Sequence, residues 1–182
     1  MNFFDLGNGI TIKSLESQHA AELFRVTDRD REYLRLWLPW VDGVLKVENT
    51  AGYIEFARKQ RADNLGFHYA IWSGSDICGG IAVPEVNWVT GVAKIGYWLA
   101  EGYQGKGIMT SATLALCSHL FGDLGMNRVE IRCAVANRKS RAIPERLGFK
   151  HEGTLRQVEK LADGMVDHAV YGMLASEWKQ RN

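Results

Sequence analysis

The stretch EGYQGKGIMT, residues 101–110, marks the point where the chain changes from one kind of structure to another. Residues 92–101 alternate apolar and polar side chains like a strand, and residues 108–121 repeat apolar side chains at helical spacing. A helix that begins here leaves its first backbone N–H groups without partners, and such groups attract anions. Glycines at 105 and 107 let a ligand approach the main chain. Two interpretations remain open on these residues: a phosphate-binding helix N-terminus, or a tight strand-to-helix turn.

Two common phosphate-binding motifs are excluded at this position. The dinucleotide fingerprint G-x-G-x-x-G fails because Thr110 stands where the third glycine belongs. The P-loop pattern G-x-x-x-x-G-K-[ST] fails because Lys106 is followed by Gly107. The formal net charge of +1 gives the chain no general attraction for nucleic acid or anionic lipid, so neither is an expected partner. Any anion site has to be built locally.

The segments on either side of residues 101–110 predict the rest of the fold. Upstream, three strands joined by short polar turns indicate an antiparallel meander. Downstream, the strand at 128–136 alternates strictly, with apolar residues up to Val135 on one face and Glu130 between two arginines on the other. The expected strands are 9–15, 67–73, 76–88, 92–101, 128–136 and the hairpin 150–161 and 165–174; the expected helices are one capped by Ser17, a second ending near 36–40, one over 49–64 capped by Asn49 or Thr50, and two at 108–121 and 139–146.

Length and composition are those of one globular domain. The chain has 182 residues, of which 46% are hydrophobic and 24% charged, so we expect a single domain over 1–182. The N-terminus shows no signal-peptide pattern, and no apolar run approaches the roughly 18 residues of a membrane span, so we expect a cytoplasmic protein. Cys78, Cys117 and Cys133 are odd in number and form no CxxC pair, so they are expected as buried thiols, with neither disulfides nor a metal site.

Several motifs carry a family resemblance. Gln104 and Gly107 resemble the acyl-CoA pyrophosphate loop of the GNAT superfamily of N-acetyltransferases, written [QR]-x-x-G-x-[GA], with Met109 as a departure from the pattern. The run NRKS at 137–140, followed by ERLGF at 145–149, resembles the family's N-x-x-S region. Over about residues 75–178, the stretches GYWLAEGYQGKG, ANRKSRAIPERLGFKHEGTLRQ and DHAVYGMLASEW are similar to the Rim-type branch, which acetylates the N-terminal amine of ribosomal proteins.

The resemblance implies a fold and a co-substrate. The fold is α+β (mixed α/β): a mainly antiparallel central sheet of about seven strands, with helices on both faces and a central strand pair that splays apart to admit the pantetheine arm. The co-substrate is acetyl-CoA, held without a metal. A bulge beside Gly96 would aim a backbone N–H at the thioester carbonyl. The implied acetyl-CoA contacts are Tyr97, Trp98, Leu99, Gln104, Gly105, Lys106, Gly107, Ile108, Met109, Thr110 and Asn137.

The N-x-x-S region carries two implied roles. Asn137 would bond the pantetheine arm, and Ser140 would contact the sulfur or donate the proton that the departing thiolate needs. The alternative for Ser140 is a cap of the helix that follows. The cluster Arg138, Lys139 and Arg141 either meets cofactor phosphates or lies on a solvated face.

The general base is sought among three residues. The resemblance aligns Glu159 with a proposed base of the Rim-type branch, whereas the alternative is a solvated charge on a hairpin. Glu85 and His68 compete for the same role. An α-amine, with a pKa of about 7.8, needs less help than a lysine with a pKa of about 10.4.

Some of the remaining aromatic residues are candidates for the surface that binds the acceptor. Trp37 and Trp40, together with Glu85, are candidates for a substrate groove, and Trp72 is expected in the core. The first hypothesis is acetyl transfer to the N-terminal α-amine of a protein, such as a ribosomal protein, by direct attack in a ternary complex. The alternatives are a small amine such as a polyamine or aminoglycoside, or a non-catalytic acyl-CoA sensor. Acceptor identity and oligomeric state, a homodimer included, stay open.

Overall fold

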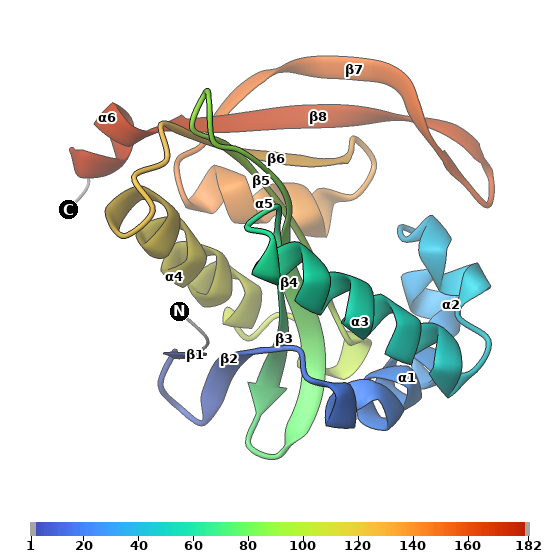
Figure 1. The fold of residues 1–182 in the computed structure, drawn as a ribbon. Coiled ribbons are helices and arrows are strands. Elements are labelled where there is room, and N and C mark those ends of the chain that lie inside the picture. Colours follow the sequence, from blue (N-terminus) through green and yellow to red (C-terminus); the bar gives the residue numbers. More distant parts are fainter. Residues whose placement is uncertain (1–2, 181–182) are drawn as a thin grey trace.

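Segments rich in β-branched and aromatic residues form an eight-stranded sheet whose two faces are both covered by helices (Figure 1). The structure is a computed structural model that describes residues 3–180. Every pair of neighbouring strands is antiparallel except β5 and β6, which are parallel. In sheet order the strands are β1 (Phe3–Asp5), β2 (Ile10–Ser14), β3 (Phe67–Ser73), β4 (Asp76–Asn87), β5 (Val92–Leu99), β6 (Arg128–Ala134), β8 (Gly164–Leu174) and β7 (Lys150–Leu161).

The helices divide between the two faces of the sheet. Helices α1 (Ala20–Arg29) and α3 (Val47–Ala62) pack together and against β3 and β4. Helices α4 (Ile108–Gly122) and α5 (Arg138–Arg146) lie against β5 and β6 on the opposite face. Within residues 3–180, no helix has both the length and the apolar character needed to cross a membrane. The helices are α1 (Ala20–Arg29), α2 (Arg31–Leu34), α3 (Val47–Ala62), α4 (Ile108–Gly122), α5 (Arg138–Arg146) and α6 (Ala175–Lys179), with short 3-10 helices at Ser17–His19, Pro39–Gly43 and Glu101–Tyr103.

Strand alternation divides the core into two layers. Tyr69 of β3 points to the face covered by α4, where it joins a cluster that contains Leu116. Trp72 points to the other face and packs with Leu23 of α1 and Ile54 of α3, so its predicted place in the core is confirmed. The three cysteines are free and buried, as their spacing predicts.

The central strands β5 and β6 separate half-way along their length. They pair from Val92 with Arg128 to Ile95 with Ile131. Beyond this point residues 96–99 pair only with β4, and residues 132–134 pair only with β8. The splayed central pair and the mainly antiparallel sheet are therefore confirmed.

The sheet differs from the sequence prediction at its edges. It has eight strands instead of about seven, because the three residues of β1 add an outer strand beside β2. Strand β6 ends at Ala134, so Val135 lies outside it and is exposed. Glu130 is buried although it is charged, and hydrogen bonds from Arg128 and Arg132, at 2.9 and 2.6 Å, satisfy its carboxylate.

Two predicted helix starts are also wrong. Helix α3 begins at Val47, and Asn49 accepts hydrogen bonds from the N–H groups of Leu45 and Lys46 at 3.2 and 3.1 Å from inside the first turn. Ser17 does not cap α1, because a 3-10 turn precedes that helix. At α3 the start is shifted because the Asn49 side chain, inside the first turn, satisfies backbone N–H groups that lie before it.

Candidate active site

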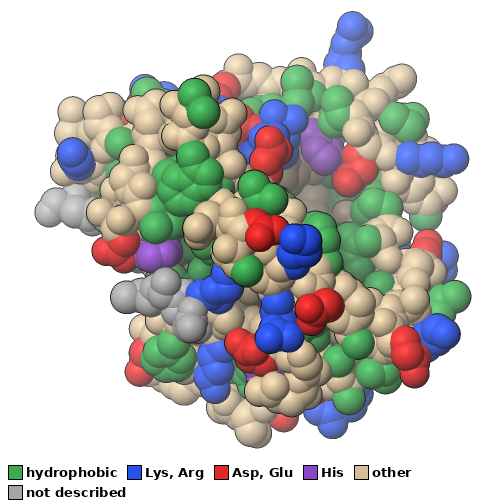
Figure 2. All heavy atoms as spheres, viewed as in Figure 1, with side chains coloured by type: hydrophobic (Ala, Val, Ile, Leu, Met, Phe, Trp, Pro, Cys, Tyr) green, Lys and Arg blue, Asp and Glu red, His purple; other side chains and the backbone are tan. Residues whose placement is uncertain are grey.

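The gap between the splayed ends of β5 and β6 opens into a cavity of about 1560 Å³. Its walls come from β4, β5 and β6, the turn before α4, the start of α5, the helices α1 to α3 and the hairpin β7–β8. Figure 2 shows a hollow in the surface that is turned to the viewer. In Figure 1, which has the same view, the hairpin β7–β8 arches over the molecule above this hollow. The volume exceeds the roughly 300–1000 Å³ of a typical small-molecule site, so it has room for more than one small molecule.

Unpaired backbone donors line one end of the cavity. Gly105 and Gly107 both adopt the left-handed conformation, with φ of 73° and 76°, which turns the chain into α4. The first hydrogen bond of α4 runs from Ser111 N–H to the Gly107 carbonyl at 3.0 Å, so the N–H groups of residues 108–110 have no acceptor within the helix. No side chain caps this terminus and no acidic residue lies in its first turn. The arrangement suits an anion.

Three cationic side chains surround these donors. Lys106 Nζ donates to the Gly102 carbonyl at 3.0 Å, and Lys139 Nζ donates to Gln104 Oε1 at 2.9 Å. Arg146 Nη1 donates to Thr110 Oγ1 at 2.8 Å, so α5 is tied to the first turn of α4. All three line the cavity. Sequence reasoning missed Arg146, because only the packing of α5 beside α4 brings it to the loop.

The splay itself is bridged by a tyrosine. Tyr97 Oη on β5 donates to the Ser140 carbonyl at 2.9 Å, which links one side of the gap to the start of α5. Asn137 Oδ1 accepts from Ser140 N–H at 3.1 Å, so Asn137 is the N-cap and the alternative that Ser140 caps the helix is wrong. The Cys133 thiol also lines the cavity, and burial raises its pKa.

The bulge lies on a different strand from the predicted one. The β4–β5 pairing shifts between Ala82 and Glu85 while β5 advances only from Gly96 to Lys94, so the extra residue is in β4, which carries Pro84 there. Proline has no N–H to donate to a ladder, which favours a bulge at this position.

Two adjacent glycines of β4 make room for Trp98. A Cβ at Gly79 would lie 2.5 Å from the Trp98 carbonyl oxygen, and a Cβ at Gly80 would lie 2.7 Å from the indole nitrogen. The indole meets Trp40 edge to face, with ring centroids 6.2 Å apart. Trp37, Trp40 and Trp98 all line the cavity and give it an aromatic wall.

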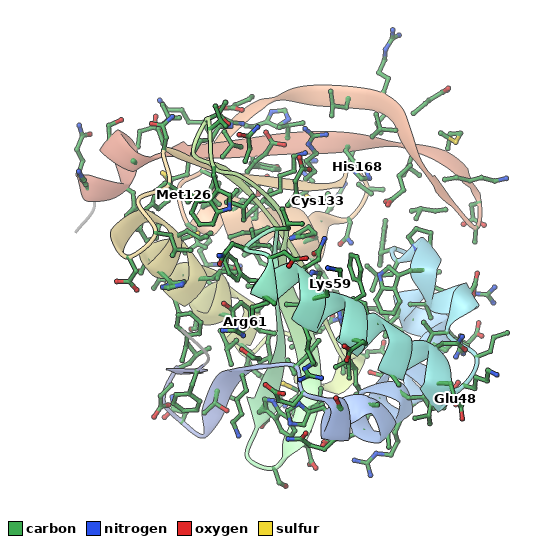
Figure 3. All side chains as sticks on the ribbon, viewed as in Figure 1. Glu48, Lys59, Arg61, Met126, Cys133 and His168 are labelled. Carbon is green, nitrogen blue, oxygen red and sulfur yellow. The ribbon has the colours of Figure 1, made fainter. Side chains whose placement is uncertain are left out.

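The β7–β8 hairpin brings two titratable groups to the cavity. His168 Nε2 lies 3.0 Å from Glu159 Oε2, and both side chains are among the lining groups. Figure 3 shows His168 on strand β8 of this hairpin. The sequence singled out Glu159 but not His168, because the register that makes them neighbours is a tertiary property.

A second histidine, His68, lies across the cavity. Its Nδ1 is 2.9 Å from Tyr53 Oη and its Nε2 is 2.9 Å from Gln60 Oε1. Burial lowers the pKa of His68 and raises that of Tyr53 to about 12. Since an amide oxygen only accepts, Nε2 carries the proton and Nδ1 accepts from the tyrosine. Neither ring nitrogen is left to take a proton from a substrate.

A family comparison agrees with this geometry. Residues 10–150 match the family model described as an acetyltransferase (GNAT) domain. The chain belongs to the GNAT acetyltransferase family. It is an N-acetyltransferase of GNAT type.

Individual GNAT relatives cover nearly the whole chain. It is 34% identical over 171 residues to the putative ribosomal N-acetyltransferase YdaF of Bacillus subtilis (strain 168), which covers 93% of each protein. It is 27% identical over 176 residues to the ribosomal-protein-serine acetyltransferase of Escherichia coli (strain K12), covering 93% of this chain and 94% of that protein. The crystal structure of the microcin C7 self-immunity acetyltransferase MccE in complex with acetyl-CoA and AMP superimposes with a TM-score of 0.88 at 28% identity, covering 93% and 94%.

Most residues predicted for a GNAT site lie together. Every predicted acetyl-CoA contact, both catalytic candidates and the two groove tryptophans line the cavity. Glu85 does not: it is exposed and paired with Lys94 at 2.7 Å. Of the basic cluster, Lys139 lines the cavity, whereas Arg141 is turned to Tyr171, to whose hydroxyl its Nε donates at 2.9 Å.

The departure of Met109 from the GNAT pattern has a structural explanation. Its side chain is buried in the core cluster shared by α4 and the sheet, next to Ile108. A larger residue is therefore accommodated where the family pattern has Gly or Ala.

Proposed function

We propose that this enzyme transfers an acetyl group from acetyl-CoA to the N-terminal α-amine of a protein, such as a ribosomal protein, in the cytoplasm. One domain over residues 1–182 would carry both substrates, and the amine would attack the thioester directly in a ternary complex. The observation that carries the proposal is one cavity lined both by a helix terminus with unpaired backbone N–H groups and by an ionisable pair. Two relatives named as ribosomal acetyltransferases support the acceptor class.

The co-substrate end is proposed from charge and backbone geometry. The N–H groups at 105–110, with Lys106, Lys139 and Arg146, supply donors and positive charge for the pyrophosphate. The gap beside Tyr97 would take the pantetheine arm. Asn137 uses its Oδ1 as a cap and retains its amide N–H groups for that arm. Acetyl-CoA bound to MccE supports the choice of co-substrate.

The reacting end needs a proton acceptor and a proton donor. The amine loses a proton as it attacks, and the pair of Glu159 and His168 is the ionisable group that faces the cavity from the hairpin. Ser140, which lines the cavity at the start of α5, would donate a proton to the departing thiolate. For an α-amine the cost of deprotonation at pH 7 is about 1.1 kcal/mol, against about 4.6 kcal/mol for a lysine. A partly exposed pair therefore suffices for an α-amine.

Acceptor profiling tests the proposal. Peptides that begin with Ser, Ala or Thr are compared with the same peptides blocked by an N-terminal acetyl group and carrying one internal lysine, with CoA release and intact mass as readouts. We expect turnover on the free N-termini only. Turnover confined to blocked, lysine-bearing peptides, or none on any peptide, would overturn the protein α-amine assignment.

A small-molecule acceptor is the second candidate. MccE, at 28% identity, is seen with AMP as well as acetyl-CoA. In this chain the aromatic wall of Trp37, Trp40 and Trp98 offers faces on which a nucleobase or another planar group can stack. A panel of polyamines, aminoglycosides and aminoacyl nucleotides, run beside the peptides, distinguishes the two acceptor classes by kcat/KM.

A further inference from the structure

The hairpin histidine has one ring nitrogen that the fold does not use. His168 Nε2 faces Glu159 Oε2 at 3.0 Å. An ionised carboxylate only accepts hydrogen bonds, so Nε2 carries the ring proton of the neutral imidazole. The lone pair then lies on Nδ1, which makes no hydrogen bond to any residue in the described range 3–180. The pair therefore presents an unpaired basic nitrogen on a side chain that lines the cavity.

Strand register holds the pair in place. Glu159 of β7 lies directly opposite Val166 of β8, and His168 is two residues further along β8 on the same face. Ala134, at the end of β6, is the partner of His168 on its other side. That end of β6 borders the gap between β5 and β6, so the imidazole lies beside the gap. The strand that carries it is paired with β6 on one side and with β7 on the other.

Four other ionisable groups that line the cavity do not compete for the proton. Arg132 of β6 also lines the cavity, and its Nε is engaged by Glu130 at 2.6 Å. From α3 and β3, Tyr53 has a pKa raised by burial to about 12, and His68 has both ring nitrogens bonded. Tyr33 of α2 is hydrogen-bonded to Gln104.

We infer that His168 Nδ1 is the atom that takes the proton from the acceptor amine, and that Glu159 is a positioning residue that holds the imidazole tautomer and stabilises the imidazolium. This inference rests on the proposed function. The amine lone pair forms the C–N bond to the thioester carbonyl carbon, the amine proton moves to Nδ1, and the C–S bond breaks. The thiolate is protonated to CoA thiol, and His168 returns its proton to solvent. Carboxylate–imidazole pairing of this kind keeps the ring in the productive tautomer.

Conservative variants separate the two roles. His168→Gln keeps an amide N–H that can donate to Glu159 but removes the basic nitrogen. If the pair had only a structural role, this variant would therefore keep its turnover. We expect kcat on an α-amine peptide at pH 7 to fall by about 10²- to 10⁴-fold, with acetyl-CoA affinity unchanged and much of the rate recovered toward pH 9. Glu159→Gln should cost less than His168→Gln. The matched control is His151→Gln on the same hairpin, an exposed position outside the cavity, which should leave kcat unchanged.

A rescue experiment tests the inference if the His168→Gln variant loses its structure. If His168→Gln fails to bind acetyl-CoA, His168→Ala is assayed with added imidazole. Turnover should rise with the imidazole concentration in His168→Ala and should not rise in His151→Ala. Wild-type kcat in His168→Gln across pH 6 to 9, a larger loss in Glu159→Gln, or absence of imidazole rescue would overturn the inference. Failure of the wild-type enzyme to acetylate any α-amine peptide would instead remove the proposed function.

Discussion

Gly107→Ala tests whether the turn before α4 binds acetyl-CoA. Gly107 has φ of 76°, and a Cβ built there meets no atom within 4 Å. Alanine therefore clashes with nothing and only strains the backbone. Rotation of φ to relieve the strain re-aims the N–H groups at 107–110, which are the donors proposed for the pyrophosphate.

Gly125→Ala is a matched control for this substitution. Gly125 has φ of 65°, also meets no atom within 4 Å, and does not line the cavity. The left-handed conformation costs a residue with a Cβ about 1–2 kcal/mol, which for a domain of this size lowers Tm by about 2–8 °C. We expect this shift in both variants.

Only Gly107→Ala should change acetyl-CoA affinity. Loss of one hydrogen bond to a charged group costs about 1.5–3 kcal/mol, so Kd should rise by about 10- to 150-fold. Isothermal titration calorimetry measures Kd, and differential scanning calorimetry measures the shift in Tm. An unchanged Kd for Gly107→Ala, or an equal rise for Gly125→Ala, would refute the assignment of the loop.

Other predictions address the remaining groups of the site. Glu159→Gln should slow transfer more for a lysine acceptor than for an α-amine, because the α-amine is already partly neutral at pH 7, and raising the pH to 9 should recover much of the rate; pH-rate profiles on paired peptides measure this. Ser140→Ala should lower kcat more than acetyl-CoA affinity, and Asn137→Ala should do the reverse; equal losses of affinity would leave Ser140 as a binding residue only. Cys133 lines the cavity and burial raises its pKa, so alkylation should be slow at neutral pH, faster at higher pH, and blocked by acetyl-CoA, as mass spectrometry of the labelled peptide would show.

Local sequence determines the elements of this fold and the position of the proposed anion site. The strand and helix periods on either side of residues 101–110 predict β3, β4, β5 and α4 within a few residues, because backbone conformation and side-chain alternation are set by near neighbours. Gly105 and Gly107 lie at positive φ, where residues with a Cβ are strained. The loop could therefore be proposed from its own residues together with the family resemblance.

Other groups of the candidate site are brought together only by tertiary structure. His168 meets Glu159 only through the register of β7 and β8, and Arg146 reaches Thr110 only because α5 packs beside α4. Glu85, which reads in sequence like a candidate base, lies outside the cavity and pairs with Lys94 because of the bulge in β4. A single shift in register sends a side chain to the opposite face of a sheet, and that register is set by long-range pairing and packing that no short stretch of sequence contains.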